Sequence, residues 1–515
     1  CVSHRSVIGK GYRAVAGRLL MSETNQARRS LARGGIVGFV GAMASAILGF
    51  AFTIILSRML GTTGAGVVTQ ATGVFAIVMA LAKVGLDSTA IYLMPRLSLD
   101  SPQEIRATLS FMATMTVGVS TVCVLILEAV APLIWNAEVS GATRAVLWFV
   151  PIGALTLVAS AALRALGNMR EYVLVQNLIL PGLRPLLVAL AAAVTGSLAL
   201  VSVAWALPFV VVLVASWWLL LKHMPSAADS VGRWPSAQRR RQVVSFALPR
   251  TLTAGLEQAL QWLDVLLVGL LAGDAASGIY GGAIRFIQAG MVVDTALRVV
   301  VSPQFSKLLH QRRTSELRDL YATASIWLVL FAAPIYTLMA IFAPALMRIL
   351  GDGFAPGANV LVVLCIGSIV TFMAGNIHSL LIMSGRSGWA AVNKVVVLTF
   401  NVVGNVIFIP RGGMVAAAIV WAVCMVLDAA MATIQVSRFI GVTPKLSEVV
   451  KPILVVGVSA VIPGGCIAWI CGRDSFVGTV LGSALSILVF ACVCWLLRAH
   501  LHLSGLGSLA KKKRG

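Results

Sequence analysis

Residues 61–66 read GTTGAG, and residues 273–278 read GDAASG. Each stretch has glycine at its first and sixth positions. Each also follows a long apolar run and precedes another run, which ends at Pro95 in the first case and at Pro303 in the second. A tight turn between two helices needs residues that accept a positive φ, and glycine does so without steric cost. The pattern predicts that the chain uses one helical hairpin twice, once in each half.

The composition places these hairpins in a membrane. Of the 515 residues, 59% are hydrophobic and only 11% are charged, whereas soluble domains carry about 25% charged residues. About fourteen apolar runs recur along the chain, most of them long enough to cross a bilayer. Because these runs are continuously apolar, they fit helices and not the alternating strands of a membrane barrel. We predict an all-α polytopic membrane protein with about fourteen transmembrane helices.

The two hairpins are separated by an even number of apolar runs, so both halves of the chain would share one orientation as parallel repeats. This predicts two six-helix lobes followed by an appended helix pair. The expected segments are a basic tail (1–34), an N-lobe (35–221), a basic linker (222–242), a C-lobe (243–440), the helix pair (441–498) and a second basic tail (499–515).

The formal net charge is +22, and the basic residues lie mainly in the two tails and in every second loop. Membrane topology explains this distribution better than a nucleic-acid partner does, because cytosolic loops are enriched in Lys and Arg. We expect a multi-pass protein of the bacterial plasma membrane with both termini in the cytosol. No signal peptide is visible, and the true start stays open between Cys1 and Met21.

Four stretches of the chain, in this order, resemble one protein family. Residues 55–97 contain an LG-x-x-x-x-G loop and then L-x-x-x-G-L, and residues 163–177 read LRALGNMREYVLVQN. Residues 246–269 have an early proline and an aspartate before an apolar stretch, and residues 401–423 contain Asn-x-x-x-Asn, Ile-Pro and Ala-Ala. Together they resemble bacterial polysaccharide (O-antigen type) flippases of the multidrug/oligosaccharidyl-lipid/polysaccharide exporter superfamily.

The resemblance implies a flippase that moves an undecaprenyl-diphosphate-linked oligosaccharide across the plasma membrane by alternating access. The implied partners are the lipid-linked oligosaccharide, membrane lipids, and glycan polymerase or glycosyltransferases. The sequence contains no catalytic constellation, no nucleotide-binding loop, and no CxxC or His-rich spacing. We therefore expect neither an enzyme nor a bound cofactor or metal.

Charged residues inside apolar runs are candidates for the substrate site, because a charge within the membrane is costly unless it is paired or hydrated. Arg184 lies in mid-span between two prolines, and Arg285 lies well inside another run. A planar guanidinium binds phosphate through parallel hydrogen bonds. We expect Arg184 and Arg285 to bind the diphosphate, with Arg250 and Arg298 as further candidates.

Two acidic residues, Glu257 and Asp264, are candidates for ion coupling. They are seven residues apart, which places them on one face of a helix. A carboxylate pair in a cavity could carry the proton or Na⁺ that drives export. The alternative is that these carboxylates form ion pairs with Arg184, Arg250 or Arg285.

Two further pairs have the i, i+4 spacing of helical ion pairs: Lys83 with Asp87, and Asp294 with Arg298. They lie in the second and eighth apolar runs, close to the prolines that end those runs. We expect structural ion pairs near the cytosolic edge of the membrane.

Three other functions stay open. A cation-coupled multidrug exporter of the same superfamily would share the two six-helix repeats and could use Glu257 and Asp264 as its ion site. A lipid II flippase of peptidoglycan synthesis carries a similar diphosphate lipid, but residues 35–57 lack the basic residues that we would expect in its first span. A membrane scaffold for glycan assembly would leave the buried charges without a role.

Overall fold

The computed structural model describes residues 4–224, 232, 234–442 and 446–497, with the side chains of residues 37–224, 232, 234–442 and 450–497. All elements within these residues are helical, so the predicted all-α class is confirmed. The predicted C-terminal tail and part of the predicted linker lie outside the described residues.

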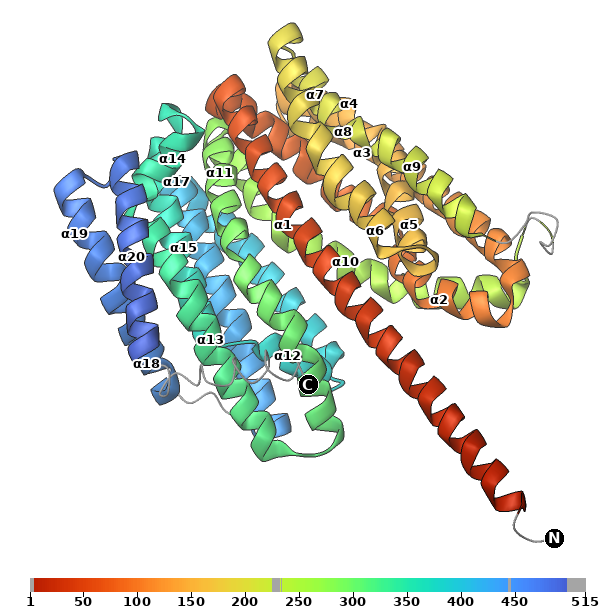
Figure 1. Ribbon diagram of the computed structural model, residues 1–515. Coiled ribbons are helices and arrows are strands. Elements are labelled where there is room, and N and C mark those ends of the chain that lie inside the picture. The colour runs from red at the N-terminus through yellow and green to blue at the C-terminus, as the bar shows by residue number, and fades with distance from the viewer. Residues whose placement is uncertain (1–3, 225–231, 233, 443–445, 498–515) are drawn as a thin grey trace.

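The helices of the first half fall between the N-terminus and the linker (Figure 1). They are α1 (His4–Ala82), α2 (Leu86–Asp100), η1 (Pro102–Glu104), α3 (Ile105–Ile134), α4 (Ala137–Leu147), α5 (Val150–Leu166), α6 (Met169–Tyr172), η2 (Val173–Ile179), α7 (Leu180–Thr195), α8 (Leu198–Ala206) and α9 (Pro208–His223).

The helices of the second half begin after the linker. They are α10 (Ala237–Ala272), α11 (Asp274–Gly290), α12 (Val292–His310), α13 (Thr314–Ile341), α14 (Ala343–Leu350), η4 (Asp352–Gly357), α15 (Ala358–Met373), α16 (Ile377–Met383), α17 (Ser387–Ile440), α18 (Leu446–Val456), η5 (Gly457–Val461), α19 (Ile462–Cys471) and α20 (Phe476–Leu496).

The first glycine of each motif has the backbone conformation that the hairpins require, whereas the sixth glycines, Gly66 and Gly278, lie within helices and do not have a positive φ. α1 folds back at Gly61, which has a φ of 67°, and Gly273 between α10 and α11 has a φ of 93°. Two other short loops behave in the same way, with φ values of 61° at Gly196 and 57° at Gly413 within α17. An L-residue with a side chain rarely adopts these values, so the sequence places glycine there.

Ten described helices are long and apolar enough to cross a membrane, or up to eleven if the bent pair α4 and α5 counts as one span. Two of the ten contain a hairpin turn and therefore two arms: α1 from Val37 onward, and α17. The predicted number of about fourteen transmembrane helices stays a prediction. The predicted second span is also not continuous, because Val84 and Gly85 have φ values of 50° and 61° and separate α1 from α2.

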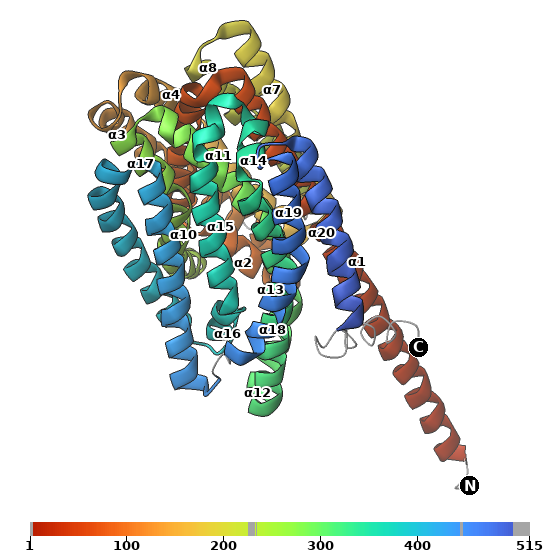
Figure 2. The same cartoon turned by 90° about the vertical axis from the view of Figure 1, so that its left-hand side faces the viewer.

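The helices form two groups that meet at the end carrying Gly61 and Gly273, which we call the hairpin end (Figures 1 and 2). The groups spread toward the opposite end, the tail end, where α1 begins. α1 packs along α11, with ring centres of Phe50 and Phe286 5.0 Å apart. α10 joins both groups: its residue Ala247 lies in a core cluster with residues of α2, α3 and α5, whereas its last turns contact α17. Three of the predicted site residues, Arg250, Glu257 and Asp264, therefore lie on the helix that connects the two groups.

Candidate functional site

Arg184 is held in the first group of helices without being neutralised. It lies in α7, and its guanidinium carbon is 4.2 Å from the ring centre of Trp205 and 5.1 Å from that of Phe209. Stacking on aromatic faces stabilises a guanidinium and leaves the donors at its edge available. The Nε atom is buried and has no hydrogen-bond partner among the described residues. The side chain is therefore positioned to bind an acceptor that the protein itself does not supply.

Arg285 occupies a comparable position in α11. Its Nη1 donates to Oε1 of Gln288 at 3.0 Å, and its guanidinium carbon lies 5.4 Å from the ring centre of Trp262 in α10. Arg184 and Arg285 are close enough to repel each other electrostatically, although they come from opposite halves of the chain. Neither forms an ion pair with a described carboxylate. Two unneutralised cations in an apolar interior would be stabilised by a bound anion.

The other two predicted arginines are not brought to this pair. Arg298 donates from Nη2 to Oδ2 of Asp294 at 2.6 Å, in α12, and is therefore already paired. Arg250 is an exposed residue of α10. The second predicted pair is also present, because Nζ of Lys83 lies 2.6 Å from Oδ2 of Asp87.

Asp264 is a buried carboxylate held by two amides. Its side chain is in α10 with 2% of its surface exposed, and Oδ1 accepts hydrogen bonds of 2.8 Å from both Asn401 and Asn405 in α17. Glu257, two turns earlier, is exposed and forms no hydrogen bond or ion pair with a described residue. The two carboxylates therefore do not form one site, and neither is paired with an arginine. No group of three or more His, Cys, Asp or Glu in the described chain could hold a metal ion.

The sequence motif with two asparagines four residues apart contained the signal for this contact. Asn401 and Asn405 lie one turn apart on α17 and so face the same way. The reasoning from the sequence did not connect them to Asp264, because the contact spans more than 130 residues of chain.

The hairpin end is closed by the sixth glycines of the two opening motifs. A Cβ atom added at Gly66 would overlap the carbonyl oxygen of Asp274, and one added at Gly278 would lie 2.8 Å from the amide nitrogen of Gly66. Asp274 also accepts hydrogen bonds from the side-chain amides of Gln70 at 2.7 Å and Asn136 at 2.8 Å. The first glycine of each motif makes the turn, and the sixth permits the two helices to cross in backbone contact.

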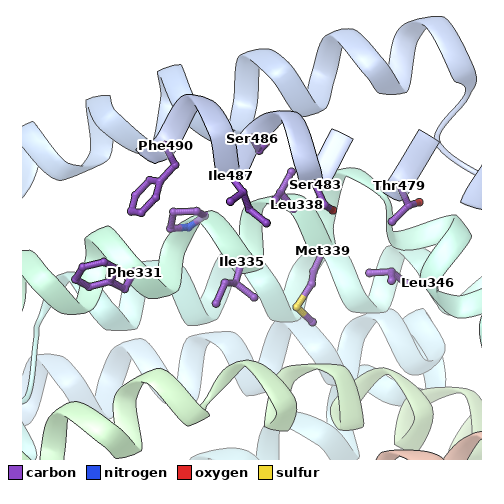
Figure 3. Close-up of a pocket in the computed structure, with 11 residues that line it drawn as sticks. Phe331, Ile335, Leu338, Met339, Leu346, Thr479, Ser483, Ser486, Ile487 and Phe490 are labelled. Carbon is purple, nitrogen blue, oxygen red and sulfur yellow. The ribbon is translucent and has the colours of Figure 1, made fainter. Parts of the chain in front are cut away.

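An apolar pocket of 430 Å³ lies between α13 and α20, away from these charges (Figure 3). Leu346 and Thr479 lie at one end of it, and Phe331 and Phe490 lie at the other. Its polar lining consists of hydroxyl groups only, so it suits hydrocarbon and not a charged head group.

Comparison with known protein families gives one match that covers more than half of the chain. The family described as polysaccharide biosynthesis protein matches residues 31–309. The probable low-salt glycan biosynthesis flippase Agl15 of Haloferax volcanii is 21% identical over 216 residues. That alignment covers 42% of this chain and 46% of Agl15, so it spans less than half the length of the relative.

Solved structures show the same fold. The lipid II flippase MurJ in an inward closed conformation aligns with a TM-score of 0.69 and 13% identity, over 91% of this chain and 99% of MurJ. A multidrug resistance MATE family transporter of the MOP superfamily, in an inward-facing conformation, aligns with a TM-score of 0.64 and 15% identity. That alignment covers 77% of this chain and 94% of the transporter. At these identities the likeness establishes the fold alone.

Proposed function

The chain belongs to the polysaccharide biosynthesis protein family, and on that premise we propose that it flips an undecaprenyl-diphosphate-linked oligosaccharide across the plasma membrane. A transporter of this superfamily is what the family match and the shared fold support. The proposed substrate is one repeat unit of a polysaccharide on its lipid carrier. Glycosyltransferases would then act before the flipping step, and a glycan polymerase would act after it.

One observation carries this proposal: Arg184 and Arg285 are neighbouring cations without a carboxylate partner among the described residues. A diphosphate provides two negative charges and several acceptor oxygens, which match two guanidinium forks. Because desolvated cations repel each other, the bound diphosphate would stabilise both arginines at once. The lipid tail would remain among the bilayer chains while the head group crosses.

We place the movement between two lobes, residues 35–221 and 243–440, with the appended pair 441–498 moving with the second lobe. The crossing of Gly66 and Gly278 closes the hairpin end in this arrangement. Alternating access requires that contact to open and the tail end to close around the substrate. With both termini in the cytosol, the hairpin end would be the exit side.

Asp264 is our candidate for the residue that binds the coupling cation. A buried carboxylate that accepts two amide hydrogen bonds keeps one negative charge in the protein interior, where a proton or Na⁺ would neutralise it. Glu257 is exposed and does not contribute to this position. Transport by Asp264→Asn should no longer respond to the driving gradient. If transport by this variant still depends on the gradient, Asp264 does not take part in coupling.

The arginine pair also separates the alternatives. A multidrug exporter for organic cations would place two unneutralised positive charges beside its own cationic substrate, which electrostatics disfavours. A lipid II flippase would use the same diphosphate chemistry with a different glycan. The glycan that accumulates when the protein is absent distinguishes these two lipid substrates.

The test is a lipid analysis of cells from which this protein has been removed, with rescue by Arg184→Ala and Arg285→Ala. We expect undecaprenyl-diphosphate oligosaccharide to accumulate in the inner leaflet and both variants to leave it there. Arg411→Ala serves as the matched control, because Arg411 is an exposed residue at the Gly413 turn and should rescue fully. Accumulation of lipid II, or a normal lipid pool with increased sensitivity to cationic drugs, would contradict the proposed substrate.

A further inference from the structure

A second polar site lies at the break between α15 and α16. α15 ends at Met373 and α16 begins at Ile377, and between them Gly375 has a φ of 63°. The side-chain amide nitrogen of Asn376 in this break is buried and has no partner among the described residues. Broken helices within a membrane protein expose backbone and polar groups where water is scarce, and they commonly form ion or substrate sites.

The first turn of α16 carries His378, which faces an acidic residue of α17. Nε2 of His378 lies 3.7 Å from Oδ2 of Asp428, and Nζ of Lys394 donates to the same oxygen at 2.5 Å. Asp428 has 3% of its side chain exposed, and its other oxygen, Oδ1, is buried without a partner. Two basic groups therefore compete for one carboxylate oxygen.

The charges around His378 are nearly balanced. Those that act on it are Asp428 and Lys394 from α17 and Asp294 and Arg298 from α12. The two carboxylates and the two cations cancel, so a neutral His378 leaves the cluster without net charge. A proton on His378 would leave one uncompensated positive charge, which a membrane interior disfavours unless an anion is nearby.

We propose that the His378–Asp428 pair binds a proton together with the anionic head group of the substrate. The added proton makes His378 a cation, which donates a hydrogen bond to Oδ2 of Asp428 in place of Lys394. Lys394, which is one-third exposed, then loses this acceptor and becomes an unpaired cation that an anionic head group would stabilise. No covalent bond changes: the proton comes from water, and Lys394 keeps its own proton throughout.

This inference rests on the proposed function and adds a linked proton to it. The linkage is reciprocal: if the head group favours the protonated cluster, then a lower pH must favour binding of the head group. The site is separate from Asp264, which is held by Asn401 and Asn405 and lies on α10. It is also separate from Arg184 and Arg285, which need no proton to bind an anion.

The test is isothermal titration calorimetry of the full chain in lipid nanodiscs, with undecaprenyl-diphosphate-linked oligosaccharide as the probe. Its diphosphate is esterified at both ends and so keeps its charge over the pH range used. Titration in two buffers with different heats of ionisation gives the number of protons taken up per ligand. We expect about one proton for the unmodified protein near pH 6.5, and an affinity that rises up to about tenfold for each unit that the pH falls.

Substitution then locates the proton. His378→Gln should bind the probe with about one proton fewer taken up than the unmodified protein, and with an affinity that depends less on pH. His310→Gln, which changes an exposed histidine at the end of α12, should keep the full uptake. Binding by the unmodified protein without proton uptake would overturn the inference, as would unchanged uptake by His378→Gln. If the unmodified protein does not bind the probe at any pH, the proposed function fails first, and the inference fails with it.

Discussion

Closure of the hairpin end depends on a helix crossing that tolerates no side chain. A methyl group at Gly66 would overlap the carbonyl oxygen of Asp274 and lie 2.7 Å from its carbonyl carbon and 2.9 Å from the amide nitrogen of Gly278. Carbon atoms pack at about 3.5–4.0 Å, and the carbonyl oxygen lies nearer still than the carbon, so α1 and α11 would have to separate by more than about 1 Å. Overpacking costs about 1–3 kcal/mol, and we expect the upper end because the atoms in the way belong to the backbone.

Gly66→Ala should therefore lower the ratio of closed to open molecules at the hairpin end by about 100-fold, since each 1.4 kcal/mol is a factor of ten in an equilibrium constant. The readout is the distance between spin labels at two exposed positions of this end, Thr63 on α1 and Asp352 on η4. We expect one short distance in the unmodified protein and a longer distance in Gly66→Ala.

The matched control is Gly118→Ala in α3, where an added Cβ meets no atom within 4 Å. That substitution removes a helical glycine without overpacking and should leave the label distance unchanged while raising stability by up to about 1 kcal/mol. A short, unchanged distance in Gly66→Ala would refute the reasoning, because it would mean that the crossing adjusts without opening.

Two further predictions concern side-chain contacts. Asp264→Ala leaves the buried amide of Asn401 without its acceptor, whereas that of Asn405 keeps Oδ1 of Asn401 at 3.1 Å; the loss of the acceptor costs about 1–3 kcal/mol. Thermal unfolding in detergent should show a larger loss for Asp264→Ala than for Asp264→Asn, and equal losses would contradict the contact. At the loop before α20, a 2.7 Å hydrogen bond from Arg348 lowers the pKa of the exposed Asp474 carboxyl below its ordinary 3.8. A lowered folded-state pKa contributes stability that is present above the unfolded value and is lost as the pH falls through the folded value. Hydrogen exchange at 472–475, corrected for intrinsic rates, should thus be the same at pH 7 and pH 5 and faster at pH 3. Asp474→Asn should exchange faster already at pH 7. Equal exchange of this variant and the unmodified protein at pH 7 would show that the contact with Arg348 does not stabilise the loop.

The turns of the fold could be predicted from the sequence because they depend on single residues. Gly61 and Gly273 have positive φ, a property that residue type alone indicates. The same reasoning treated the sixth glycines, Gly66 and Gly278, as turn residues too, and this was wrong because both are helical. Their role is a contact between helices far apart in the chain, and no local pattern encodes which helix will be the neighbour.

The candidate site was predictable to the same extent. Charge inside an apolar run pointed to Arg184 and Arg285, and in the part of the chain that the structure describes neither has a carboxylate partner. Helical spacing also pointed to Glu257 and Asp264 as a pair. That spacing fixes a shared face but not what covers it, and here α17 covers Asp264 and leaves Glu257 exposed. Tertiary neighbours decide which of two equivalent helix positions is buried.

The central claim is that Arg184 and Arg285 hold a diphosphate while the head group crosses the membrane. The most direct test is the rate at which the purified protein flips undecaprenyl-diphosphate-linked oligosaccharide in proteoliposomes. A hydrogen bond to a charged group contributes about 1.5–3 kcal/mol, so Arg184→Ala and Arg285→Ala should each slow flipping by about 10- to 100-fold, while Arg411→Ala keeps the full rate. Flipping by both variants at the rate of the unmodified protein would contradict the account.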